Sequence, residues 1–368
     1  MEVIVGCFLG DYGTGKILSE LSRLVPAVAR GLLSRPRRFP WPLNRVAGFN
    51  FGTSKDARVE LDGLLASLVR ERRFELAAND GTKGGRTAGV LDTMLEMQSK
   101  QLAAGGPKAD ELEFDDVWIF DNLFSAFFAG FDTTSVTLTR TLQYLASEDS
   151  KVQGLVEALR EELAKSVLAV EGTLPESEGA ATAGHVKTGP QGIFRAFPLL
   201  DAVVLESNRM SPAAGGVFRT AKKDVKYNGY LIPKGETILW NLSVGSMAES
   251  LYPAPERFCP FRFLHGDERM KEPVGSGSGD HWASTSETSA LVAAAAPGVE
   301  DQPRPNMFGF GRHMCPGREL AKLEIVMFLK AFLRKYDYSV VEGQNLNGQP
   351  TRAAPKDGLR IVLKQRGA

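Results

Sequence analysis

A ten-residue segment near the C-terminal end constrains this 368-residue chain more than any other feature. Residues 308–317 read Phe-Gly-Phe-Gly-Arg-His-Met-Cys-Pro-Gly and contain Cys315. Gly309, Gly311 and Gly317 let the backbone approach a flat group closely, since a Cβ atom would collide there. The residues after Cys315 predict a helix, so the sulfur lies at a helix N-terminus. The dipole and the free N–H groups of that terminus favour a thiolate over a thiol.

Three interpretations of Cys315 are open on these residues alone. The sulfur could be a thiolate ligand of iron in a flat macrocycle, where its electron donation promotes O–O cleavage. A lone cysteine is also commonly a buried apolar filler. The third interpretation is a nucleophile paired with His313. The glycine spacing favours the iron ligand.

Composition excludes several classes of protein. The 44 basic and 44 acidic side chains give a net charge of zero, which argues against a nucleic-acid partner. Cys7, Cys259 and Cys315 are odd in number and far apart, so they form no disulfide framework and no zinc-finger spacing. The apolar stretches at Met1–Gly10 and Leu123–Phe131 are too short to cross a membrane, so we expect no transmembrane segment in this chain.

Hydrophobic periodicity predicts a mainly helical chain with small β-sheets and no internal repeat. Two segments rich in small residues, at about 171–193 and 265–305, are predicted insertion loops. The predicted helices are Lys16–Leu33, Asp56–Phe74, Val90–Ser99, Asp115–Ala146, Val152–Leu168, Phe197–Met210 and Gly317–Arg334, with Pro316 at a first helical position. The predicted strands are Asp224–Tyr227 and Tyr230–Ile232 around an Asn-Gly turn, then Glu236–Trp240, Tyr338–Val341 and Leu359–Leu363.

The cysteine segment resembles the haem-binding loop of the cytochromes P-450, written Phe-Gly-x-Gly-x-Arg-x-Cys-x-Gly. The matching residues are Phe308, Gly309, Gly311, Cys315 and Gly317. His313 stands where the family most often has an Arg that binds a haem propionate, which a protonated imidazole also binds. The resemblance implies a cytochrome P-450 fold and haem b (iron protoporphyrin IX) as cofactor, with Cys315 as the iron ligand.

The family also carries a Glu-x-x-Arg pair that a later Arg closes into a buried triad. Glu206 and Arg209 lie three residues apart on a predicted helix and therefore share a face. The family pattern Pro-x-x-Phe-x-Pro-x-Arg-Phe aligns with residues 255–263, which assigns the third position to Arg262. Arg257 of the literal Pro-Glu-Arg-Phe string is then a surface residue. The triad is implied to be structural.

The long helix contains Ala-Gly-Phe-Asp-Thr-Thr at residues 129–134. A hydroxyl that bonds back to the i−4 carbonyl, here Thr133 to Ala129, loosens a helix. In the family the matching segment crosses the distal haem face, where Asp132 and Thr133 would relay protons to bound oxygen. Arg219 stands where family members place a second propionate ligand.

The implied activity is a monooxygenase reaction that inserts one oxygen atom of O2 into a lipophilic substrate. An isoprenoid, a retinoid-like compound, a sterol or a fatty acid is expected, because residues 211–219 and the hairpin after them look like the retinoid-hydroxylating branch. Electrons would come from an NADPH-dependent flavoprotein reductase or a ferredoxin.

The resemblance begins near residue 15, and the N-terminal portion of a usual family member has no counterpart here. Residues 1–368 are therefore expected to form a single incomplete domain. The full-length form is expected at the surface of the endoplasmic reticulum or another organelle membrane. The alternatives are a catalytically silent protein of this fold that binds or regulates a partner and, more remotely, a cysteine hydrolase that uses Cys315 and His313.

Overall fold

A computed structural model describes most of the chain. The described residues are 1–10, 15–32, 51–78, 89–103, 114–147, 154–165, 197–264, 305, 307–309, 311–349, 352–355 and 358–367. They form two compact units, Met1–Asp132 and Thr133–Ala368, which are treated separately below.

The first unit is helical throughout its described part. Its elements are α1 (Glu2–Leu9), α2 (Gly15–Leu32), α3 (Phe51–Ala78), α4 (Val90–Ala103) and the first half of α5 (Asp116–Leu145). Helices α2 and α3 pack together, and the Ser54 hydroxyl donates a 2.7 Å hydrogen bond to the Ala27 carbonyl. The buried Arg72 guanidinium binds both carboxylate oxygens of Asp92, at 2.5 and 3.1 Å, and so ties α3 to α4.

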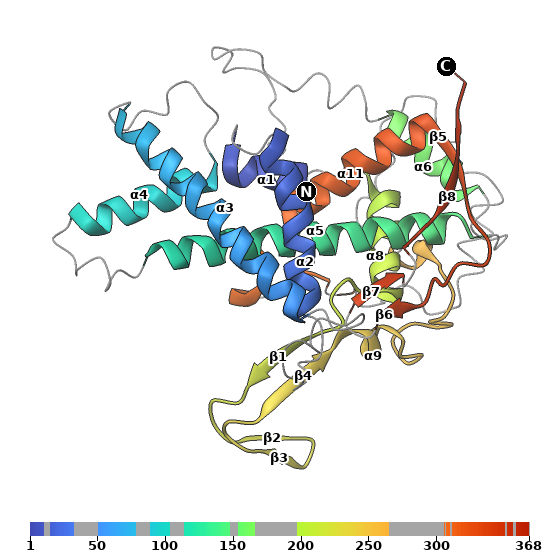
Figure 1. Cartoon of the computed structure of the whole chain (residues 1–368). Helices are drawn as coiled ribbons and strands as arrows, with labels where there is room; N and C mark the ends of the chain where they lie inside the picture. The colour runs from blue at the N-terminus through green and yellow to red at the C-terminus, as the bar shows by residue number, and fades with distance from the viewer. Residues whose placement is uncertain are drawn as a thin grey trace, which may run out of the picture. The chain divides into compact units, whose positions relative to one another are not determined.

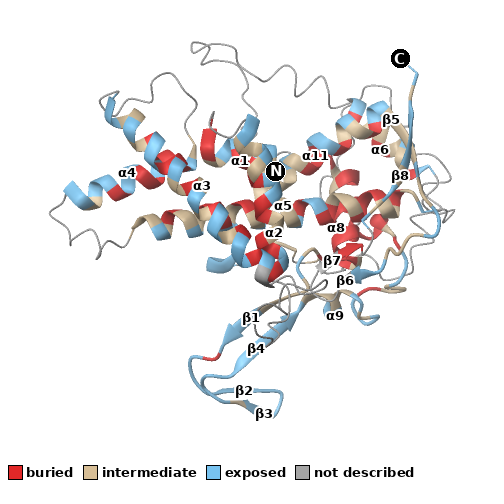
Figure 2. Ribbon diagram, viewed as in Figure 1, coloured by how far each residue is buried: buried red, intermediate tan, exposed pale blue. Residues whose placement is uncertain are grey.

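The second unit is built around one buried helix. Its helices are the rest of α5, α6 (Leu155–Lys165), α8 (Pro198–Met210), α9 (Leu242–Ser246) and α11 (Arg318–Lys335). Ten of the thirteen residues of α8 are buried, and the helix is mainly red in Figure 2. The Glu162 carboxylate of α6 accepts hydrogen bonds from the Leu199 and Leu200 N–H groups, at 2.8 and 3.0 Å. A carboxylate stabilises a helix N-terminus, because it satisfies free donors and complements the dipole.

The strands of the second unit pair as four antiparallel two-stranded sheets (Figure 1). These are β1 (Gly216–Thr220) with β4 (Thr237–Asn241), β2 (Val225–Tyr227) with β3 (Tyr230–Ile232), β5 (Tyr336–Val340) with β8 (Ile361–Gln365), and β6 (Gly348–Gln349) with β7 (Arg352–Pro355). The β2–β3 turn places Asn228 and Gly229 at φ values of 48° and 82°, the left-handed region that an Asn-Gly hairpin turn requires.

The prediction of a mainly helical chain with small sheets is confirmed, and the predicted long elements are present with shifted ends. Strand β5 begins two residues earlier than predicted, directly after α11. Sequence reasoning missed α1, α9, β1, β6 and β7. The predicted loop at about 171–193 lies outside the described residues, and so does the one at about 265–305 except for residue 305.

None of the helices in the described ranges combines the length and the apolar character that a membrane span requires. The compartment suggested by the sequence, an organelle membrane surface, stays a prediction.

Candidate functional site

The loop before α11 holds Cys315 by backbone hydrogen bonds. The Cys315 N–H donates to the Phe308 carbonyl at 2.8 Å, and the Met314 N–H donates to the Gly311 carbonyl at 3.1 Å. Gly309 and Gly311 have φ values of +69° and +65°, where a side chain would be strained. These two glycines let the chain turn back on itself, so that Cys315 stands half-buried at the end of a closed loop.

The three glycines of this loop have different surroundings. A Cβ atom at Gly309 would lie 3.5 Å from the His313 carbonyl oxygen, whereas one at Gly311 would meet nothing within 4 Å. Gly317 has an ordinary φ of −85°, and a Cβ atom there would lie 3.9 Å from the Cys315 sulfur. The turn therefore requires glycine at 309 and 311. At Gly317 neither the backbone angle nor the neighbouring atoms require it.

Helix α11 begins later than the sequence predicts. Its first residue is Arg318 and its N-cap is Gly317, so the prediction that Pro316 occupies the first helical position is wrong. The Arg318 N–H reaches back to the Cys315 carbonyl at 3.4 Å, while the Ala321 N–H bonds to the Gly317 carbonyl at 2.9 Å. Cys315 and Pro316 thus belong to the turn that leads into α11.

The surroundings of Cys315 suit the axial ligand of a macrocyclic cofactor. The described residues contain no cluster of three or more His, Cys, Asp or Glu side chains that would hold a metal ion by themselves. Haem would bring its own ring ligands to the iron, so the chain would need to supply only the Cys315 thiolate. Over the described part of the loop, no hydrogen bond joins the Cys315 thiol to the exposed His313 imidazole, as a cysteine hydrolase would need.

Glu206 is the centre of a buried ion cluster. Both of its carboxylate oxygens accept from the Arg209 guanidinium, at 2.8 and 2.9 Å, and Oε1 also accepts from Arg262 Nε at 3.1 Å. The Cys259 N–H donates the fourth hydrogen bond to this carboxylate, to Oε1 at 2.9 Å, and burial raises the pKa of the Cys259 thiol. Glu206 and Arg209 are fully buried and Arg262 is 5% exposed. The exposed Arg257 takes part through its backbone carbonyl, which accepts from Arg209 at 3.3 Å.

Asp132 and Thr133 lie next to each other on α5, half-buried and exposed respectively. They are the last residue of the first unit and the first residue of the second. The neighbouring Thr134 is buried, and its hydroxyl lowers the pKa of the Glu324 carboxyl group on α11 by hydrogen bonding. Thr134 and Glu324 belong to the helix that carries Thr133 and to the helix that follows Cys315.

Sequence reasoning missed Glu324. It lies within the predicted helix after Cys315, where a carboxylate is unremarkable on a solvated face. Burial raises the pKa of its carboxyl group, and the hydrogen bond from Thr134 acts in the opposite direction. No signal in the sequence marks it, because its burial and its neighbour Thr134 come from the tertiary structure.

The two residues expected to bind propionates are both exposed. His313 ends the short 3₁₀ turn Gly311–His313. Arg219 lies in β1, opposite Ile238 of β4, and its guanidinium donates to the carbonyl of the preceding Phe218 at 2.7 Å. Their role toward a cofactor stays a prediction.

Comparison with known families identifies the protein family in which this cysteine loop occurs. The sequence model of the Cytochrome P450 family matches residues 36–354, which include Cys315, the Glu206 cluster and the 129–134 segment of α5. The chain belongs to the cytochrome P450 family. Haem is the cofactor of this family, and the described surroundings of Cys315 fit it.

Two curated relatives of this P450 chain are named as hydroxylases. It is 28% identical to abscisic acid 8'-hydroxylase 1 of Arabidopsis thaliana, over 97% of this chain and 60% of the relative. It is 27% identical to taxane 13-alpha-hydroxylase of Taxus cuspidata, over 89% of this chain and 56% of the relative. The chain thus spans 56–60% of the length of these two relatives.

Solved structures show the same fold. Cyanobacterial CYP120A1 with bound retinoic acid matches with a TM-score of 0.65 at 22% identity, over 99% of this chain and 66% of that one. A zebra fish cytochrome P450 with abiraterone matches with a TM-score of 0.63 at 21% identity, over 100% of this chain and 69% of that one. The cytochrome P450 fold expected from the sequence is confirmed.

Proposed function

We propose that the chain is a haem-dependent monooxygenase that inserts one oxygen atom of O2 into a lipophilic substrate. The observation that carries the proposal is the closed loop of Phe308–Cys315, which presents a half-buried thiol directly before α11. Bound haem b would supply the iron-centred activation of O2 that no amino-acid side chain provides. Cys315 would hold the iron from one side as a thiolate.

The other side chains would position groups and move protons. Asp132 and Thr133 would pass protons from solvent toward the oxygen atom that leaves as water. His313 and Arg219 would hold the two propionates by charge-assisted hydrogen bonds. The cluster of Glu206, Arg209 and Arg262 would brace the region without touching the substrate.

An isoprenoid is the substrate class that the relatives support, since those named above act on abscisic acid and a taxane, both isoprenoids. The likeness of residues 211–219 to the retinoid-hydroxylating branch points the same way. Electrons would come from an NADPH-dependent flavoprotein reductase or a ferredoxin.

A second candidate is a catalytically silent member of the fold that binds or regulates a partner. It is favoured by one observation, that the chain spans 56–60% of the length of the relatives compared above. A haem pocket closed by residues outside this span would leave the chain without a tightly bound cofactor.

The reduced carbon-monoxide difference spectrum of the purified chain tests both candidates. A Soret band of the thiolate type is expected for the native sequence and for Cys7→Ala, which removes an exposed cysteine. The band should be lost in Cys315→Ala, because the axial sulfur is gone. A native chain reconstituted with haem that shows no such band would favour the silent protein. A thiolate-type band that survives in Cys315→Ala would refute the ligand assignment.

A further inference from the structure

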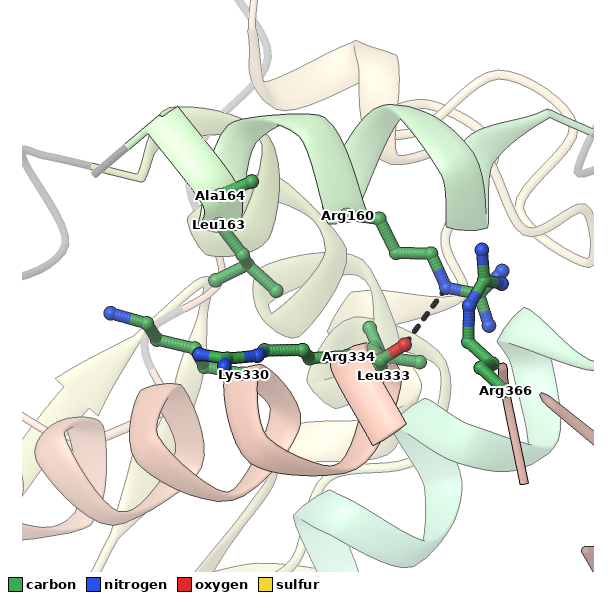
Figure 3. A pocket seen from close by; sticks show the side chains of 7 residues that line it. All are labelled: Arg160, Leu163, Ala164, Lys330, Leu333, Arg334 and Arg366. Carbon is green, nitrogen blue, oxygen red and sulfur yellow. Dashed lines mark hydrogen bonds between the residues drawn. The ribbon is translucent and has the colours of Figure 1, made fainter. Parts of the chain in front are cut away.

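A cavity of about 500 Å³ lies between α6, the C-terminal part of α11 and the end of β8, within the second unit (Figure 3). Its lining residues are Arg160, Leu163, Ala164, Lys330, Leu333, Arg334 and Arg366. Pockets for small molecules commonly have about 300–1,000 Å³. The cavity is separate from the cysteine loop, because α11 runs for roughly 20 Å between them at a rise of about 1.5 Å per residue.

Two of the four cations that line the cavity are already neutralised. Arg160 and Arg366 both bind Asp337 Oδ1, at 2.7 and 2.8 Å, and both form ion pairs with Glu157. Arg160 also donates to the Leu333 carbonyl at the end of α11, at 2.9 Å. Figure 3 shows the guanidinium groups of this pair together at one end of the cavity.

The other two cations, Lys330 and Arg334, have no carboxylate partner in the described part of the chain. They lie one turn apart on α11, where like charges repel and slightly destabilise the helix. A basic residue in the last turn of a helix is stabilised by the helix dipole, and this explains why Arg334 is basic. It does not account for Lys330, which lies before the last turn. Among the described residues at the cavity, the positive charges therefore exceed the negative ones by two.

The remaining lining is apolar. Leu163 and Leu333 are buried members of the core around α8, and Ala164 is an exposed residue at the rim. The aliphatic stems of Lys330 and Arg334 add further apolar surface while their charged ends stay in contact with water. An apolar surface beside two uncompensated cations is complementary to a molecule with an anionic head and an apolar body.

We propose that this cavity binds a small amphipathic organic anion, with a phosphate or carboxylate head on Lys330 and Arg334 and an apolar body against Leu163, Ala164 and Leu333. A guanidinium binds such a head through two parallel hydrogen bonds, and an ammonium adds a point charge. Inorganic anions would bind weakly, because they leave the apolar lining in contact with water.

Titration calorimetry of the whole chain with hexyl phosphate tests the proposal. Lys330→Ala/Arg334→Ala should weaken binding at least about tenfold, because both head-group contacts are lost. The matched control Lys222→Ala/Lys223→Ala removes two exposed charges from the β1–β2 connection and should leave binding within about twofold, since only distant, solvent-screened charge changes. Ala164→Glu changes one exposed rim residue and should block binding by placing a carboxylate beside the two cations.

Three results would overturn the proposal. The first is that hexyl phosphate does not bind the native chain. The second is that Lys222→Ala/Lys223→Ala weakens binding as much as Lys330→Ala/Arg334→Ala does. The third is that inorganic phosphate or hexanol binds as tightly as hexyl phosphate, which would show that head and body do not act together. Circular dichroism of each variant verifies that the chain is folded, and Ala164→Glu tests the site without removing any native charge.

Discussion

Glu206 shows how much one buried charge depends on its partners. Its carboxylate is fully buried and shared between Arg209 and Arg262, so each arginine offsets part of the cost of removing the charge from water. The Arg262→Ala variant lacks one of these two arginines, so the buried charge of Glu206 is compensated only by Arg209. We expect the free energy of unfolding to fall by about 3 kcal/mol, measured by urea denaturation.

Arg257→Ala is the matched control for that variant. The Arg257 side chain is exposed, and its contribution to the cluster is a backbone carbonyl that alanine retains. We expect a change within about 0.5 kcal/mol. Equal losses in the two variants would mean that the stability comes from surface charge and not from the cluster. The family pattern at residues 255–263 assigns the third position to Arg262, and in the structure Arg262 Nε donates to Glu206 Oε1.

Glu324 gives a dependence of stability on pH. Burial holds the pKa of its carboxyl group above the ordinary value of 4.5, so the folded chain binds this proton more tightly than the unfolded chain does. The resulting stabilisation is complete at pH values below the ordinary pKa and is lost as pH rises through the pKa that the group has in the folded chain. Glu324→Gln keeps a neutral partner for Thr134, and its stability relative to the native chain should therefore increase as pH rises from the ordinary pKa of 4.5 through the raised pKa of the folded chain.

Unfolding of both proteins at a series of pH values measures this difference. Glu249→Gln, at an exposed position, is the control and should show a difference that does not vary with pH in this range. If the difference in stability between Glu324→Gln and the native chain did not vary with pH, the carboxyl group of Glu324 would be solvated in the folded native chain. Sequence reasoning could not find this residue, since a glutamate in the middle of a helix acquires a raised pKa only through the elements packed on it.

The elements of the second unit were predictable where local signals were strong. Helix α8 and the β2–β3 hairpin have their own start and turn residues, Pro198 and Asn228-Gly229. Strand β1 was missed, because Gly216–Thr220 becomes a strand only by pairing with β4, twenty residues further on. The short β6 and β7 pair with each other and carry too few residues to show a period.

The cysteine loop is an element whose two left-handed glycines have separable roles. Gly309→Ala and Gly311→Ala should each cost about 1–2 kcal/mol through backbone strain. The Cβ atom at 309 would point at the loop itself, toward the His313 carbonyl, whereas the one at 311 would enter open space. If haem lies over that space, Gly311→Ala should also lower the haem-to-protein ratio and Gly309→Ala should not. A haemochromogen assay on both variants measures the ratio, and equal ratios would place the macrocycle elsewhere.

At the scale of the whole molecule, the equal numbers of basic and acidic side chains remove the net charge that keeps chains apart in solution. Association then depends on exposed apolar surface and on unpaired strand edges. In the part of the chain that the structure describes, β1 and β4 pair only with each other, so each strand leaves one edge free. The cross-strand pair Phe218 and Leu239 is 66% and 52% exposed on this ribbon.

Phe218→Lys/Leu239→Glu tests whether this ribbon limits solubility. Opposite charges facing each other across two strands keep a favourable pair of roughly 0.2–1 kcal/mol, so the ribbon should persist while its apolar surface disappears. We expect the protein concentration at which light scattering rises to increase severalfold. The control Phe74→Lys removes an even more exposed aromatic ring, 77% exposed, from α3. A helix has no free backbone edge, because its N–H and C=O groups bond within the helix, and so this change should have little effect. An equal gain in the two variants would show that any exposed ring promotes association, and that the strand edge has no special part.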